Sequence, residues 1–141
     1  MNRVTYATIT GKKYPLIFSL AAVKAISARF GSVEKMADAM STENGATAET
    51  FNNISFILAV LIKQGVAYMN MFASDLPPEP ESRYENGKYI ALSQEEIEIA
   101  VDINDAESVI GKIGECIDKS SKTKIEIQAK EKNEEAPEIT E

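Results

Sequence analysis

The longest regular pattern of apolar positions predicts a single long helix over residues 47–74. Apolar or small residues recur there at steps of three and four, the spacing of one helix face. The members of this seam are Phe51, Ile54, Leu58, Leu61, Gly65, Tyr68 and Phe72, and a second apolar row adds Ile57, Ile62 and Met69. Because more than half of the circumference is then apolar, the helix must be covered by other helices of the chain or by a second copy.

The N-terminal residues, at about 3–18, predict a β-hairpin. Two β-prone runs, residues 3–10 and 14–18, flank Gly11, which is the pattern of two strands joined by a tight turn. Pro15 has no backbone N–H to donate, so the second strand should lie at a sheet edge or start after the proline. An isolated two-stranded hairpin is only marginally stable, so it must pack on the helices or pair with another chain.

Two short helices are predicted between the hairpin and the long helix. Ser19 can cap a helix whose apolar positions repeat every three to four residues up to Phe30. Gly31 supplies a left-handed stop, and Ser32 starts a second helix that carries Met36.

The C-terminal half predicts further helices and then a tail. Ser93 and Glu96 form a capping box, and Asp102 or Asn104 can divide the helical region that follows into two. Its apolar positions are Ile99, Ile103, Ala106, Ile110, Ile113 and Ile117. The periodicity fades from Ser120. The fold class expected is therefore mainly α (α+β): one helical domain with an N-terminal hairpin over residues 1–119, and a flexible, disordered acidic tail over residues 120–141.

The residue types exclude most catalytic and metal-binding chemistry. The chain has no histidine and one cysteine, which removes the commonest general base, the usual nucleophile pairs and the usual zinc sites. Cys116 falls on a core-facing helical position, where a buried thiol is expected. The acidic residues around the capping box and Asp102 fit solvated helix ends. We expect no enzyme activity, no cofactor and no metal site.

Charge and hydropathy restrict the partners. With 22 acidic and 15 basic residues, the chain has a formal net charge of −7, which disfavours nucleic acid as a partner. The most apolar window, Ile54–Ile62, is far shorter than the roughly 20 residues that span a bilayer. A single cysteine fits a reducing compartment. The sequence thus predicts a soluble protein that binds no membrane.

The first third of the chain carries a family resemblance. The order is Gly-Lys-Lys-Tyr-Pro-Leu at residues 11–16, Phe-Ser-Leu at 18–20 and Phe-Gly-Ser-Val-Glu-Lys at 30–35. It resembles the tail assembly chaperones of long-tailed bacteriophages and of prophages of Gram-positive bacteria. The resemblance implies a non-catalytic protein of the host bacterial cytoplasm. It would bind the tape measure protein and keep it soluble while tail tube protein polymerises around it.

The apolar seam has two interpretations. Most such stripes are core, but this one could also be a partly exposed face for a client or for a homo-oligomer. The client-binding residues expected under the second interpretation are Ile57, Leu61, Tyr68, Met69 and Phe72. Two other functional classes stay open: a structural phage tail or head–tail component, and a small acidic regulatory interaction protein.

Overall fold

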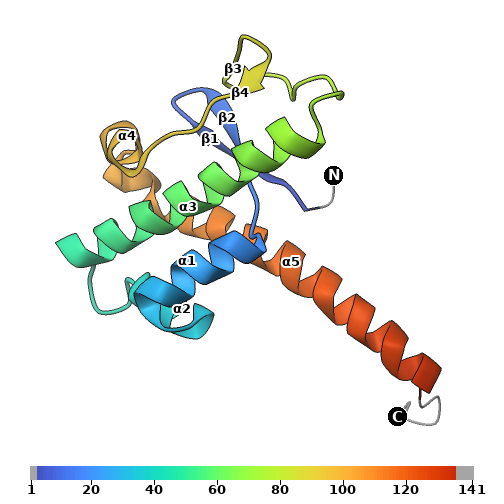
Figure 1. The fold of residues 1–141 in the computed structure, drawn as a ribbon. Coiled ribbons are helices and arrows are strands. Elements are labelled where there is room, and N and C mark those ends of the chain that lie inside the picture. The colour runs from blue at the N-terminus through green and yellow to red at the C-terminus, as the bar shows by residue number, and fades with distance from the viewer. Residues whose placement is uncertain (1–2, 136–141) are drawn as a thin grey trace.

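Helix α3 (Ala48–Phe72) is the element around which the rest of the chain is arranged (Figure 1). The computed structural model describes the backbone of residues 3–135 and the side chains of residues 3–120. In chain order, the elements are β1 (Thr5–Ile9), β2 (Lys12–Leu16), α1 (Leu20–Phe30), α2 (Val33–Ala39), α3, β3 (Tyr84–Glu85), β4 (Lys88–Tyr89), α4 (Gln94–Ala100), the 3₁₀ helix η1 (Ile103–Asp105) and α5 (Ala106–Glu135). The mainly helical fold with an N-terminal hairpin and one long central helix is confirmed.

Helix α3 begins where a capping box satisfies its first backbone N–H groups. The Thr47 side chain accepts a hydrogen bond from the Thr50 backbone N–H at 3.2 Å, and the Thr50 side chain accepts one from the Thr47 N–H. Residues on several sides of the helix are buried, because β2, α1, α4 and α5 all pack against it. The intramolecular interpretation of the apolar seam therefore holds for most of its length.

The N-terminal hairpin packs on α3 rather than standing alone. Strands β1 and β2 pair antiparallel, from Thr5 opposite Leu16 to Ile9 opposite Lys12. Just beyond β2, the Ile17 N–H donates a hydrogen bond to the Leu61 carbonyl of α3 at 3.2 Å. Gly65, one turn further along α3, lies directly beneath the backbone of Pro15. A side chain at that position would keep the strand and the helix apart.

The predicted helix caps are confirmed. The side chains of Ser19 and Ser32 each accept a hydrogen bond from the backbone N–H three residues on, at 3.1 Å, and Gly31 between them has φ of 96°. Ser93 and Glu96 form the expected capping box. Asp102, one of the two residues predicted to cap the next helix, caps η1. Local sequence signals thus fixed where these helices begin and end.

A second small hairpin was not predicted. Strands β3 and β4 pair across the turn residues Asn86 and Gly87, which have φ of 54° and 80°. Strands of two residues are too short to show the alternation of apolar and polar residues by which a strand is predicted. This hairpin is held to α3 by Asn70, whose side chain accepts from the Tyr89 N–H at 2.9 Å and donates to the Tyr89 carbonyl at 3.1 Å.

The backbone of helix α5 extends into the segment predicted as a tail. Ser120, the last residue with a described side chain, donates a hydrogen bond to the Phe18 carbonyl at 3.3 Å. The helix backbone then continues to Glu135, projecting away from the body of the molecule (Figure 1). Residues 121–135 lack a regular apolar face but consist mostly of good helix formers. The rest of the predicted tail, residues 136–141, lies outside the described residues.

Helix α3 is also the one candidate for a membrane-spanning helix among the described residues, judged by length and composition alone. Its most apolar 18-residue window has a mean hydropathy of 1.5, and half of that window is buried inside the molecule. Since the central helix of a protein core needs the same apolar composition, this finding is weak. The absence of a membrane partner stays a prediction.

The contact at Gly65 gives a test of the fold. A Cβ at residue 65 would overlap the Pro15 carbonyl group and lie 2.8 Å from the Leu16 nitrogen. We expect Gly65→Ala to lower the free energy of unfolding by about 2–3 kcal/mol, because the strand must move off the helix. Urea unfolding followed by circular dichroism measures this.

Gly111→Ala in α5 is the matched control. An added Cβ at Gly111 meets no described atom within 4 Å, so the substitution should raise helix stability by roughly 0.5–1 kcal/mol. If both alanine variants unfold at the wild-type urea concentration, the close packing of β2 on α3 is wrong.

Candidate protein-binding groove

The five residues predicted to bind a client do not form one surface. Ile57 and Leu61 are completely buried and Met69 is nearly so. Tyr68 is half-buried, and Phe72 alone is well exposed. The expectation of a client face along this stripe is therefore wrong for Ile57, Leu61 and Met69. The hairpin and the C-terminal helices cover those sides of α3 and use its stripe as their own core.

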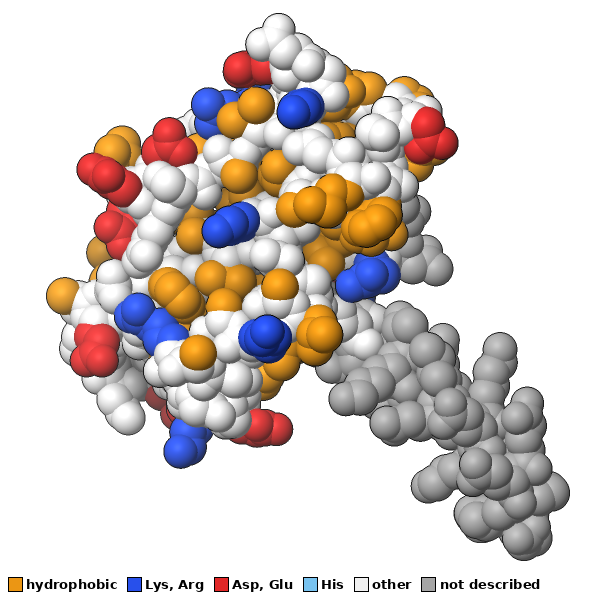
Figure 2. Space-filling view, viewed as in Figure 1, with side chains coloured by type: hydrophobic (Ala, Val, Ile, Leu, Met, Phe, Trp, Pro, Cys, Tyr) orange, Lys and Arg blue, Asp and Glu red, His pale blue; other side chains and the backbone are white. Residues whose placement is uncertain are grey.

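Tyr68 and Phe72 instead belong to a small exposed patch at the C-terminal end of α3. Their ring centroids lie 5.5 Å apart, and the Arg3 guanidinium stacks 5.3 Å from the centre of the Tyr68 ring. Met71 and Leu76 are exposed beside them. We call Tyr68, Met71, Phe72 and Leu76 the distal patch. Hydrophobic side chains interspersed with Lys and Arg are visible over α3 and α1 in Figure 2.

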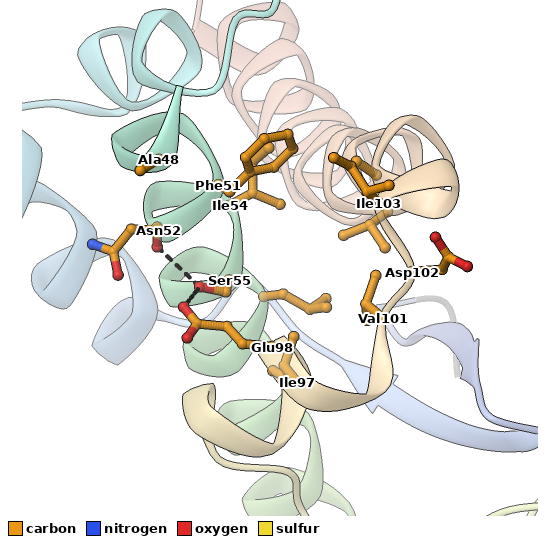
Figure 3. Close-up of a pocket in the computed structure, with 13 residues that line it drawn as sticks. Ala48, Phe51, Asn52, Ile54, Ser55, Ile97, Glu98, Val101, Asp102 and Ile103 are labelled. Atoms are coloured by element: carbon orange, nitrogen blue, oxygen red, sulfur yellow. Dashed lines mark hydrogen bonds between the residues drawn. The ribbon is translucent and has the colours of Figure 1, made fainter. Parts of the chain in front are cut away.

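A concave feature lies at the other end of α3. It is an open groove of about 580 Å³ between the first half of α3 and a bent wall made by α4, η1 and the start of α5 (Figure 3). Its lining residues are Ala48, Phe51, Asn52, Ile54, Ser55, Leu58, Ile97, Glu98, Val101, Asp102, Ile103, Ala106 and Val109. Most of these side chains are apolar, so the groove offers apolar surface to a ligand.

The wall opposite α3 is bent because the chain leaves helical geometry at Val101. Its φ of −90° and ψ of 126° are extended, which ends α4. The Asp102 side chain then accepts a hydrogen bond from the Asn104 N–H at 3.0 Å and starts η1, which leads directly into α5. The wall therefore consists of the end of α4, the 3₁₀ turn η1 and the start of α5. Because it is bent, it does not pack along α3 as closely as one straight helix could.

Polar side chains tie the two walls together at one end of the groove (Figure 3). The Ser55 hydroxyl of α3 lies 2.6 Å from the Glu98 carboxylate of α4 and 3.1 Å from the Asn52 carbonyl. The Gln94 amide donates to the Ser55 Oγ at 3.1 Å and to the Asn52 side chain at 3.1 Å. This network fixes the orientation of Glu98 and the distance between the walls at that end.

The apolar part of the groove remains open after folding. Phe51 and Ile54 point from α3 toward Ile103 on η1 (Figure 3). Ile103 keeps 68% of its surface exposed, an unusual position for an isoleucine. Ile54 is already buried, but covering Ile103 and the partly exposed Phe51 with a partner would remove apolar area from water, which is favourable.

The groove was missed by sequence reasoning for a specific reason. Ile99 and Ile103 fit the spacing of one apolar helix face, yet both are exposed, at 79% and 68%. The helical register does not continue through Val101, so their common spacing does not place them on a common buried face. The capping signal at Asp102 was the clue that the pattern is interrupted.

Cys116 lies in the core, away from the groove lining. It is completely buried, as predicted, and burial raises the pKa of its thiol to about 12. The thiol is therefore protonated at neutral pH. Among the described residues, no group of three or more acidic or cysteine side chains could hold a metal ion.

Comparison with known proteins leaves the fold and the groove as the main guides to function. No protein-family model matches the chain, and no curated protein and no solved structure shows significant similarity to it.

The difference between core and surface positions on α3 can be tested directly. Leu61→Ala should lower the free energy of unfolding by about 2–5 kcal/mol, because it leaves a cavity at a completely buried site. Phe72→Ala, in the distal patch, should change it by less than about 0.5 kcal/mol. Chemical unfolding of both variants checks this, and equal losses would contradict the assignment.

Burial of Cys116 predicts slow thiol chemistry in the native state. Because the thiol is inaccessible and protonated, Ellman's reagent at pH 8 should label native protein only through transient opening. Labelling in urea should be complete within the mixing time. As the chain has one cysteine, the absorbance change reports this site alone. Native labelling at the rate of a free thiol would contradict the packing.

Proposed function

We propose that this protein is a non-catalytic tail assembly chaperone of a bacteriophage or prophage. It acts in the host bacterial cytoplasm by holding apolar segments of the tape measure protein while tail tube protein assembles. The observation that carries the proposal is the groove of about 580 Å³, whose lining is mostly apolar and whose Ile103 remains exposed. The family resemblance of residues 11–35 supplies the identity of the client.

The groove suits a protein that holds a client and later releases it. Contact with its apolar lining contributes roughly 25 cal/mol for each Å² removed from water. Association also costs several kcal/mol of translational and rotational freedom, so a groove of this size supports binding that remains reversible. Reversibility matters because the client must be handed over to the growing tube.

The surface charge supports the same role. The chain carries a formal net charge of −7, and like charges on neighbouring complexes repel one another. A chaperone with this charge would keep a client with exposed apolar segments dispersed. Only the client's own apolar stripe needs to be covered.

Coexpression tests the proposal. The tape measure protein encoded in the same phage genome should be mostly insoluble when expressed alone and should become soluble when this chain is coexpressed. Its soluble fraction, measured by quantitative gel analysis and by copurification on a tag, should rise severalfold. The Leu61→Ala variant, which weakens the core, serves as a control that shows whether the effect on client solubility requires the folded chain.

Particle composition gives an independent test. A chaperone leaves before assembly is complete, so mass spectrometry of purified phage particles should detect tail tube protein but not this chain. Its presence at stoichiometric amounts in particles would overturn the proposal in favour of a structural tail component. Failure of coexpression to change the solubility of the tape measure protein would overturn it as well.

A further inference from the structure

We propose that the groove binds a single amphipathic α-helix that carries basic residues beside its apolar stripe. This inference deepens the proposed function, on which it rests for the identity of the client, by giving the docking place and the chemistry of the bound segment. Three properties of the groove support this occupant: the hydrogen-bonding state of its walls, the placement of its accessible apolar residues and the sign of the charges in its lining.

The walls favour a helical occupant over an extended one. The α3 wall is one continuous helix, and the opposite wall consists of α4, η1 and the start of α5, so most of their backbone N–H and C=O groups bond within these elements. An extended peptide placed between them would bury backbone groups with few partners, which is costly. A helix satisfies its own backbone and presents only side chains to the groove.

The accessible apolar residues of the groove lie on both walls. On α3, Phe51 is partly exposed, whereas Ile54 and Leu58 are buried and form the floor behind it. Val101 and Ile103 stand across from Phe51, and Ile103 is 68% exposed. A partner helix lying between the walls can present the apolar side chains of one face, at positions i, i+3 and i+4, to Phe51 and Ile103.

The two charged residues that line the groove, Glu98 and Asp102, are both acidic. Residues 89–111, which form the bent wall and its approach, contain six carboxylates and are flanked by Lys88 and Lys112. Residues 48–62 of α3 contain Glu49 and no basic residue. Figure 2 shows carboxylates gathered over α4, whereas lysines and arginines lie over α1 and the outer side of α3. Lysines or arginines beside the partner's apolar stripe complement this potential.

Two of these carboxylates stand in the groove lining itself. Glu98 is oriented by Ser55 at 2.6 Å yet remains solvent-exposed, and Asp102 is exposed at the start of η1. Both lie on the wall opposite α3, next to the apolar strip that includes Val101 and Ile103. A partner helix that fills the strip therefore places its flanking basic side chains near these two residues.

The test uses a designed probe and the full chain. The probe is a fluorescein-labelled peptide of about 18 residues, or about five helical turns, with leucines on one face and lysines on the others. A counterpart has glutamates in place of the lysines. Fluorescence anisotropy at low salt should show the lysine peptide binding about tenfold more tightly than the glutamate peptide. High salt should reduce that difference, because the charges are exposed.

Two isoleucine variants locate the binding site. Ile103→Ser should weaken binding of the lysine peptide by about fivefold or more, because a side chain that contacts the probe loses its apolar surface. Ile99→Ser is the matched control: Ile99 is similarly exposed but does not line the groove, so its affinity should stay within about twofold of wild type. The double variant Glu98→Gln, Asp102→Asn should reduce the preference for lysine over glutamate.

Each contrary outcome has a distinct meaning. Equal affinity of the two peptides, or equal effects of Ile103→Ser and Ile99→Ser, would overturn the inference. So would self-association of the isolated chain that Ile103→Ser abolishes in light scattering, because a second copy would then occupy the groove. Failure of the chaperone proposal is separate: in that case wild-type protein would not raise the solubility of coexpressed tape measure protein, whatever the peptide results.

Discussion

The close approach of the N-terminal hairpin to the central helix is the contact on which the fold depends. Gly65 allows the backbone at Pro15 to lie directly on α3, and the Ile17 N–H reaches the Leu61 carbonyl one turn earlier. With the strand this close, Leu16, Ile17, Leu61 and Ile62 are sealed together. An apolar helix that would otherwise need a partner thus becomes the core of a single chain. Other proteins can contact only the side chains that this packing leaves exposed.

The exposed apolar side chains include Leu20 at the start of α1 and groups near the two ends of α3. At the C-terminal end lies the distal patch, where Arg3 stacks on Tyr68. At the N-terminal end α4 and α5 pack on α3, but the bend at Val101 leaves a groove between them, and the Ser55–Glu98 contact fixes the spacing at one edge. Concavity lets a ligand lose water on several sides at once, so the groove has more binding potential than the patch. The acidic residues of α4 and η1 then restrict which ligands are favoured.

Prediction from sequence succeeded where the physics is local. The caps at Ser19, Ser32 and Ser93 involve hydrogen bonds over three residues, and the long periodic run of α3 reflects a single helix. It failed where a contact joins distant segments. Gly65 appeared in the sequence only as one member of the apolar seam, yet it is the glycine that meets another backbone. Phe72 was grouped with Ile57 and Leu61 because they share an apolar helix, but the hairpin covers only part of its length.

The sequence by itself determined the order of the helices, the site of the first hairpin, the capping residues and the residue types with which any function must work. A chain without histidine and with one cysteine lacks the side chains that most catalytic and zinc sites use, whatever fold it adopts. The tertiary structure alone decided which apolar residues became core and which stayed exposed. Ile97 is buried, whereas Ile99 and Ile103 are open to solvent. Burial depends on which distant segment of the chain packs against a helix. The periodicity of apolar residues within the helix does not say which segment that is.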